Sequence, residues 1–280
     1  MSRLLGWVSR PGSTRHLALL RMGLVAAAWS EWAYVRLLYK AEGYWGLAVS
    51  LLFFAGTSMA FLGWFTRLGM FATGVSSMAL VYGFGLVGGD DVYWHHHSKV
   101  LAHALVLSAL LPIGNSWSVD RWLLARRAER RGEAVPTSDG DLWATRLLCV
   151  AEAVVWFWGA IDKVELRFLN GDRMLQILFG YYAKLGDWVP IVGPLLTVVS
   201  IATVGLEFAL PLGMWFRRFR PVLLPSALLL HGLFYALLPV GSFSATMIVM
   251  LLAWVDPDEV DAVWRRLEGA PSPLPPANGG

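Results

Sequence analysis

Paired carboxylates, three histidines and a lysine stand close together in one short block of the sequence. They are Asp90, Asp91, His95, His96, His97 and Lys99. The apolar run Val100–Leu111 follows directly. Ionisable groups at the mouth of a membrane span are costly to bury, so they usually serve a pathway or a site. Carboxylate, imidazole and amine groups together supply an acid, a base and the charges that tune them. The block therefore predicts acid/base chemistry.

Helical spacing groups part of this block on one face. If a helix begins at about Val92, then His96, Lys99 and His103 stand at i, i+3 and i+7, just after the paired carboxylates. We expect Asp91 to act as acid or base, tuned by its neighbours. The predicted catalytic residues are Asp91, Asp90, Lys99 and His97. The alternative is an interfacial helix start, with aspartates stabilised by the helix dipole and histidines among lipid headgroups.

The same block is also a possible zinc site, but its spacing argues against one. Adjacent histidines point in different directions, and the chain has no HExxH spacing. Cys149 is the only cysteine, which excludes a cysteine-based metal cage. We therefore predict no metal site.

A second set of polar and aromatic residues lies mostly inside apolar runs, where charged groups face the bundle interior and need partners. The predicted substrate-binding residues are His96, His103, Arg21, Glu152, Trp156, Lys163, Glu207, His231 and Tyr235. A structural role competes with binding for several of them, since Arg21 could pair with a glutamate and fix the bundle. For Glu31, which stands near a helix end, the structural role is the prediction.

Composition places the chain in a membrane. Hydrophobic residues make up 56% of it and charged residues 15%, a mix typical of polytopic membrane proteins. The net charge of +3 gives no reason to expect a nucleic-acid partner. We predict an all-α, polytopic integral membrane bundle of about eight transmembrane helices. The predicted spans are His16–Val35, Gly46–Phe65, Met70–Gly88, Val92–Leu111, Leu147–Ile161, Val192–Phe216, Pro221–Pro239 and Gly241–Val255.

Loop charges predict the orientation. The termini and the even-numbered loops hold more arginines, so the positive-inside rule places both termini in the cytoplasm of a multi-pass cell-membrane protein. Residues 1–15 then form an amphipathic N-terminus, and 16–255 form the transmembrane domain. Within that domain, 115–146 is a polar cytoplasmic loop and 163–190 an outer interfacial segment. Residues 256–280 form a short cytoplasmic helix and a disordered tail.

Two stretches resemble a known family. His97-Ser98, followed by an apolar helix and Asn115–Asp120, resembles the Asn-His-Ser … Tyr-Trp-Ser-Val-Asp stretch of vitamin K-dependent gamma-carboxylases. Trp156–Lys163, with Asn170-Gly171 after it, looks like that family's Tyr-Phe-x-Ala-Gly-x-x-Lys … Trp-x-x-Gly pattern. The wider group is the horizontally transferred transmembrane (HTTM) domain superfamily. The resemblance covers most of the chain and implies a cavity for an isoprenoid-tailed molecule.

The departures from that family matter as much. The lysine that deprotonates reduced vitamin K in the carboxylases is replaced here by Asp91, which is a far weaker base. The chain also ends soon after the last predicted span, without the large lumenal domain that recognises the propeptide. Carboxylation of protein glutamates is therefore not the expected activity.

Three functions remain open at this point. We expect a membrane enzyme that acts by acid/base chemistry on an isoprenoid or quinone lipid, either a lyase or cyclase, or a quinone-linked oxidoreductase. One form is a terpene cyclase that starts by protonation from Asp90 or Asp91. The other class is a non-enzymatic membrane subunit for maturation or export of secreted peptides. A reduced quinone is the candidate cofactor, and the expected partner is a membrane lipid or isoprenoid.

Overall fold

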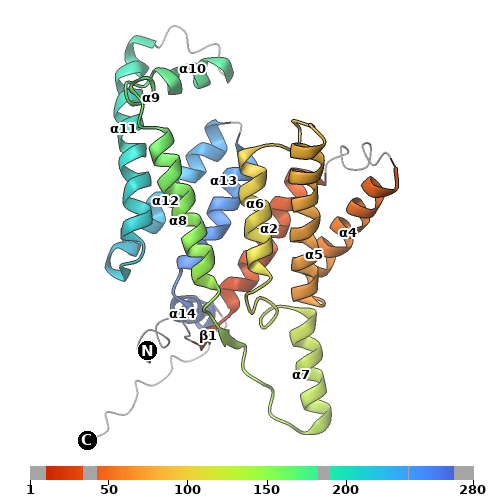
Figure 1. The fold of residues 1–280 in the computed structure, drawn as a ribbon. Helices are drawn as coiled ribbons and strands as arrows, with labels where there is room; N and C mark the ends of the chain where they lie inside the picture. The colour runs from red at the N-terminus through yellow and green to blue at the C-terminus, as the bar shows by residue number, and fades with distance from the viewer. Residues whose placement is uncertain (1–10, 34–42, 182–188, 239, 268–280) are drawn as a thin grey trace, which may run out of the picture.

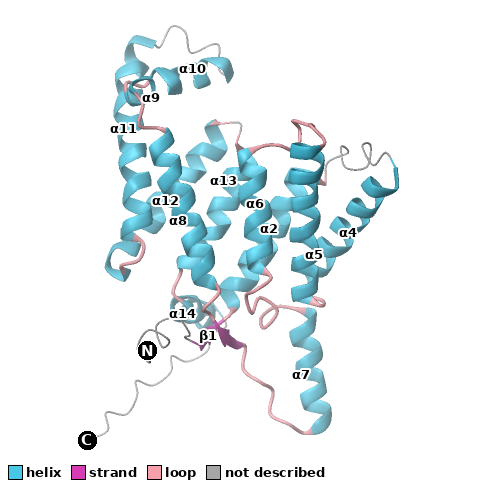
Figure 2. Ribbon diagram, viewed as in Figure 1, coloured by secondary structure: helices cyan, strands magenta, loops and turns pink. Residues whose placement is uncertain are grey.

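The structure, a computed structural model, describes residues 11–33, 43–181, 189–238 and 240–267, and these form a helix bundle with one small sheet (Figures 1 and 2). The longer helices are α2 (Arg15–Trp32), α4 (Gly43–Leu62), α5 (Thr66–Met78), α6 (His96–Ser108), α7 (Val119–Arg131), α8 (Thr145–Asp162), α10 (Asp172–Tyr181), α11 (Val189–Gly213), α12 (Arg220–Leu237), α13 (Gly241–Met250) and α14 (Pro257–Leu267). Shorter elements are the π-helix Ala79–Val87, the single turn α9 (Leu166–Leu169) and the 3-10 helices Arg217–Phe219 and Leu251–Trp254. Strands β1 (Pro11–Ser13) and β2 (Asp139–Asp141) pair antiparallel, with Gly12 opposite Gly140.

The prediction of an all-α membrane helix bundle is confirmed. Among the described residues, four helical segments are long and apolar enough to cross a membrane: Gly43–Leu62, Thr66–Val87, Val192–Gly213 and Arg217–Leu237. A helix also lies in each of the other predicted spans, but these are shorter or more polar. The count of eight transmembrane helices therefore stays a prediction.

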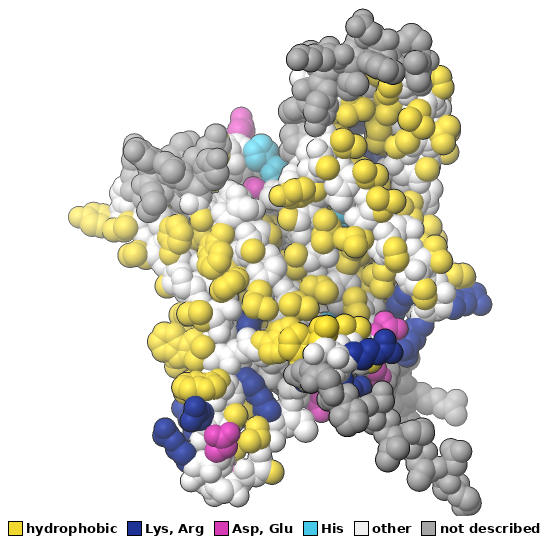
Figure 3. All heavy atoms as spheres, turned by 180° about the vertical axis from the view of Figure 1, so that it is seen from behind, with side chains coloured by type: hydrophobic (Ala, Val, Ile, Leu, Met, Phe, Trp, Pro, Cys, Tyr) yellow, Lys and Arg dark blue, Asp and Glu magenta, His cyan; other side chains and the backbone are white. Residues whose placement is uncertain are grey.

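The helices pack in an order that brings sequence-distant segments together. Helix α5 packs between α4 and α6, and α8 packs against α11. Helix α13 contacts α2, α6 and α12 and so lies in the middle of the bundle (Figure 1). Helices α9 and α10 lie at one end, the upper end in Figure 1, while α7, α14 and the sheet lie at the other, the lower end. Seen from behind, apolar side chains cover the middle of the molecule and basic ones lie near the lower edge (Figure 3).

Helix α6 begins later than predicted, at His96 rather than at about Val92. A tight turn precedes it, because the backbone N–H groups of Tyr93 and Trp94 donate to the carbonyl oxygens of Asp90 and Asp91. The Asp90 carboxylate also accepts a hydrogen bond from the backbone of Val92 at 3.1 Å. Aspartate side chains commonly compete with helix in this way.

The predicted polar and terminal segments have structure of their own. The range 115–146 contains helix α7 and strand β2, and 163–190 contains α9, the whole of α10 and the first residues of α11. Helix α14 lies within the range 256–280, where a short helix was predicted. Most of the range 1–15, the tail after Leu267 and residues 182–188 lie outside the described residues.

The buried side chain of Arg21 ties the segment between α6 and α7 to the bundle. Its guanidinium donates to the carbonyl oxygens of Ile113 at 3.1 Å and Trp117 at 2.6 Å. Asp120, just beyond, accepts hydrogen bonds from the backbone N–H groups of Phe65 (2.9 Å) and Thr66 (2.7 Å) at the start of α5. The partners of Arg21 are thus backbone carbonyls, and the alternative of a glutamate partner is not what the structure shows.

Gly63 lies at the centre of this junction and provides a test of it. Its φ is +71°, and a Cβ there would overlap the Arg21 guanidinium and Ser118. We expect Gly63→Ala to destabilise the protein by about 1–3 kcal/mol or more, because left-handed strain adds to the overlap. The measurement is the thermal unfolding midpoint in detergent. Gly83→Ala is the control, since a Cβ at Gly83 meets nothing within 4 Å. Equal midpoints for the two variants would contradict this role for the junction.

Candidate functional site

A glutamate, a histidine and a serine meet at the upper end of the bundle, near the last turn of α2 and the first turn of α6. The Ser98 hydroxyl donates to Glu31 Oε1 at 2.5 Å, and His97 Nε2 lies 3.4 Å from the same oxygen. Ser242, at the start of α13, also lies against this carboxylate. We call Glu31, His97 and Ser98 the Glu31–His97 cluster.

The cluster is partly accessible. Ser98 is fully buried, while 14% of the Glu31 side chain and 25% of the His97 side chain are exposed. The His97 ring also stacks on the ring of His95, with 5.0 Å between centroids and 8° between planes. A carboxylate that holds one side of an imidazole fixes its orientation and supports proton transfer by it. The cluster can therefore act as a general acid or base toward a ligand that reaches His97.

The sequence singled out His97 as a candidate but gave no sign of its partner in the structure, Glu31. Glu31 was predicted to be structural because it stands near a helix end. It is 66 residues from His97 in the chain, and the two meet only because α2 and α6 pack together. Nothing in the local sequence of either residue could have shown this contact.

The predicted catalytic face of α6 forms but points away from the cluster. His96 and His103 are exposed, and so is Asp91 in the turn before the helix. Lys99 Nζ lies 3.2 Å from the centre of the Trp94 ring. Asp91 and this face therefore lie toward the surface, because Ser98 is the buried residue of the first turn and His97 is partly buried beside it.

Deeper in the bundle, two tryptophans donate hydrogen bonds to two predicted substrate-binding residues. Trp156 lies in α8, and Trp254 ends the 3-10 helix that follows α13. Trp156 Nε1 donates to His231 Nε2 at 3.0 Å, and Trp254 Nε1 donates to Glu152 Oε2 at 2.8 Å. The two indole rings stack with 6.2 Å between centroids. Tyr235, also predicted to bind substrate, is 59% exposed and lies on the outer side of α12.

Lys163 and Glu207 form an ion pair between α8 and α11 at the upper end. Lys163 Nζ lies 2.8 Å and 3.0 Å from the two Glu207 oxygens and also donates to the carbonyl oxygen of Gly159 at 3.0 Å. The side chain of Glu207 is 5% exposed and that of Lys163 is 21% exposed. The lysine that ends the carboxylase-like stretch is thus engaged with a carboxylate from a distant helix.

The structure therefore divides the predicted site residues among several places. His97 contacts Glu31, and Lys163 forms an ion pair with Glu207. Glu152 and His231 accept hydrogen bonds from the two tryptophans. Arg21 donates to the segment between α6 and α7. Within the described part of the chain, no three His, Cys, Asp or Glu side chains are placed to hold a metal ion.

Comparison with known families decides the relationship. The model of the HTTM domain family matches residues 18–258, which is most of the chain. The chain belongs to the HTTM domain family. The match supports the resemblance drawn from the two stretches and indicates a membrane protein of the vitamin K-dependent carboxylase-like superfamily. No curated protein and no solved structure matches the chain.

All residues of the Glu31–His97 cluster and the Lys163–Glu207 pair lie within the matched region of this HTTM-domain protein. The ion pair makes a prediction about stability. Removing one partner of a largely buried pair leaves a charge without compensation, whereas removing both does not. We expect Lys163→Met or Glu207→Leu to cost about 3–5 kcal/mol, and the double variant to recover most of that loss.

The measurement is the unfolding midpoint of each single variant and of the double variant in detergent. The control pair is Arg173 and Glu165, which are 2.7 Å apart but roughly half exposed. Exposed pairs contribute about 0–1 kcal/mol, so their variants should change little. Single variants at Lys163 and Glu207 that behave like these controls would show that the buried pair does not stabilise the bundle.

Proposed function

We propose that this HTTM-domain protein is an integral membrane enzyme that acts by acid/base chemistry on an isoprenoid or quinone lipid. His97 is the proton-transfer group in this proposal, and Glu31 is the residue that positions it. The observation that carries the proposal is the shared oxygen: Glu31 Oε1 accepts from Ser98 at 2.5 Å and lies 3.4 Å from His97 Nε2.

The arrangement suits a base. Ser98 holds the carboxylate, the carboxylate orients the imidazole, and a quarter of the His97 side chain remains open to a ligand. An imidazole is a stronger base than the carboxylate of Asp91, which stands where the carboxylases have their lysine. His97 thus supplies a base in place of the lysine that the carboxylases have and this chain lacks at Asp91. A hydroxyl or hydroquinone O–H of a lipid would lose its proton to the imidazole.

In this proposal the lower end of the bundle faces the cytoplasm. The arginines of α7 and of the segment Arg217–Arg220 lie toward the lower end, together with α14. By the positive-inside rule this end faces the cytoplasm of the cell membrane, with both termini on that side. The Glu31–His97 cluster then opens near the outer interface, within reach of a lipid headgroup.

The cyclase alternative has less support. A carboxylic acid that protonates an alkene needs a desolvated setting to stay protonated at neutral pH. Asp91 is exposed, and Asp90 accepts a hydrogen bond from the backbone of Val92. These placements favour His97 over the aspartates as the group that transfers the proton.

A non-enzymatic role is the second candidate, and one observation favours it. The exposed side chains of Asp91, His95 and His96 gather at the upper end, where a partner protein could contact them. In Figure 3, histidine and acidic side chains are visible at the dip in the upper edge of the molecule. A maturation or export subunit would use this surface and would not need the carboxylate of Glu31.

The test compares lipid extracts of cells that express the wild type, His97→Gln or Glu31→Gln, by mass spectrometry. We expect an isoprenoid or quinone product with the wild type and at least about a 100-fold loss with His97→Gln, the usual contribution of a general acid or base. Glu31→Gln should lower the product less, because it disturbs only the position of the imidazole.

Glu165→Gln is the matched control, because Glu165 is an exposed glutamate in the loop that joins α8 to α9. Each variant must be inserted in the membrane at the wild-type level. Loss of the product with Asp91→Ala but not with His97→Gln would overturn His97 in favour of the cyclase. Identical lipid profiles for all folded variants would bring the partner-binding role to the front.

A further inference from the structure

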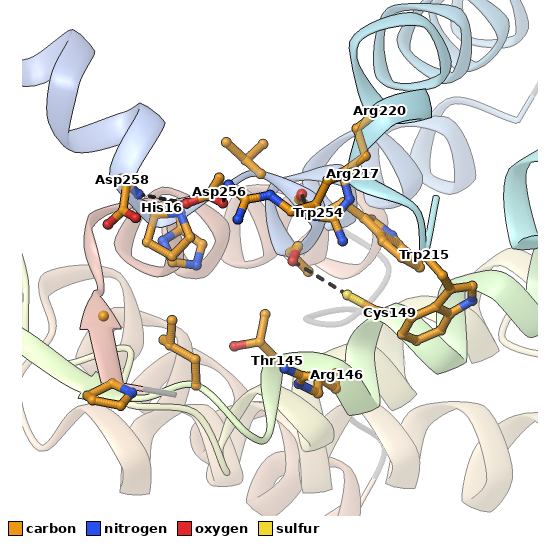
Figure 4. A pocket seen from close by; sticks show the side chains of 16 residues that line it. His16, Thr145, Arg146, Cys149, Trp215, Arg217, Arg220, Trp254, Asp256 and Asp258 are labelled. Carbon is orange, nitrogen blue, oxygen red and sulfur yellow. Dashed lines mark hydrogen bonds and ion pairs between the residues drawn. The ribbon is translucent and has the colours of Figure 1, made fainter. Parts of the chain in front are cut away.

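A cavity of about 380 Å³ opens at the lower end of the bundle, far from the Glu31–His97 cluster (Figure 4). His16, in the first turn of α2, lies at its edge, and the first turn of α8 contributes Thr145 and Arg146. His16 and Glu31 are 15 residues apart on α2, which corresponds to a rise of about 22 Å. The cavity is therefore a separate site.

Cations outnumber carboxylates around this cavity. Three arginines, Arg146, Arg217 and Arg220, line it with Asp256 and Asp258. Arg217 forms an ion pair with Asp256. Arg220 donates to the carbonyl oxygens of Met214 at 2.8 Å and Trp254 at 3.1 Å, contacts that hold the guanidinium in place without cancelling its charge.

The positive charges also face one another. Arg146, from the wall formed by α8, and Arg220, from the opposite wall, lie close enough to repel electrostatically. An anion between the two walls would relieve this repulsion. Guanidinium groups are well suited to a phosphate, because they bind its oxygens through two parallel hydrogen bonds.

Two buried polar side chains in the cavity wall point to a ligand independently of the charges. His16 is 1% exposed and Thr145 is 6% exposed. His16 Nδ1 and Thr145 Oγ1 lack a well-formed hydrogen bond among the residues that the structure describes, although the backbone of Ser13 and the carboxylates of Asp256 and Asp261 lie near the His16 ring. Buried polar atoms are nearly always paired, so a missing partner needs an explanation. A bound oxyanion would accept a hydrogen bond from each.

An apolar groove of about 780 Å³ adjoins the cavity, and Val255 lines both. The groove runs between α2 and α14, from Leu19 and Met22 to Trp264 and Leu267. Helix α14 carries acidic residues in its first turn, arginines in its last turn and two exposed apolar side chains, Val263 and Leu267, as helices at a membrane interface do. A ligand with a charged head and an apolar chain would occupy both spaces.

We propose that this cavity binds the phosphate group of an anionic lipid, with the acyl or isoprenoid chain in the groove between α2 and α14. Arg146, Arg217 and Arg220 hold the phosphate oxygens, and His16 and Thr145 complete the hydrogen bonds. The site needs no part of the Glu31–His97 cluster, so it stands whether or not the proposed enzyme activity does.

The test is a binding titration of the purified full-length protein in detergent, followed by tryptophan fluorescence, because Trp215 and Trp254 line the cavity. The probe is dioctanoyl phosphatidic acid, compared with dioctanoylglycerol and with inorganic phosphate. We expect phosphatidic acid to bind at least ten times more tightly than either. Equal binding of dioctanoylglycerol would overturn the phosphate contact, and equal binding of inorganic phosphate would overturn the lipid chain.

Variants separate a built site from general charge. Arg146→Gln should weaken phosphatidic acid about tenfold, the usual effect of losing one charge-assisted hydrogen bond. Arg127→Gln on α7 removes the same charge from an exposed position and should leave binding unchanged.

Thr145→Val removes only the unpartnered hydroxyl. It should weaken phosphatidic acid without lowering the unfolding midpoint of the free protein, because no internal hydrogen bond of that hydroxyl is lost. Wild-type binding of phosphatidic acid by Thr145→Val would overturn the site. Equal losses of affinity for Arg146→Gln and Arg127→Gln would overturn it too.

Discussion

Polar side chains buried in the bundle have to find partners inside it, because neither lipid nor the apolar core offers any. This constraint explains most of the contacts between distant helices. Arg21 donates hydrogen bonds to two backbone carbonyls of the segment after α6, and Lys163 forms an ion pair with the carboxylate of Glu207. Each contact joins elements far apart in the chain, so the cost of burying a charge also determines how the helices pack.

The same constraint separates the two ends of the molecule. At the upper end, the Glu31 carboxylate has a hydroxyl and an imidazole as partners, and the imidazole keeps an open side. At the lower end, the cavity beside His16 still contains polar atoms without partners in the described chain. The hydrogen-bonded Glu31–His97 pair, with its accessible imidazole, is suited to proton transfer. The cavity with unpaired polar atoms is suited to binding a ligand. The two proposals follow from this difference.

The sequence predicted the elements well but not their contacts. The motif at His97-Ser98 and the stretch Trp156–Lys163 indicated the family, which the match over residues 18–258 supports. The prediction for α6 was less accurate, because Asp90 and its neighbours form a turn that delays the helix to His96. In the helix that begins at His96, the side chains of His96 and His103 face outward and that of His97 turns toward Glu31.

Apolar composition and the length of the apolar runs were enough to determine an all-α membrane protein, because burial in lipid requires continuous backbone hydrogen bonding within each helix. Local motifs were enough to indicate the HTTM family. Only the tertiary structure decided which charged residues meet. Glu31 and His97, or Lys163 and Glu207, are separated by dozens of residues and become neighbours through the packing of whole helices. That packing depends on side-chain shape and pairing throughout the bundle, which no local pattern in the sequence contains.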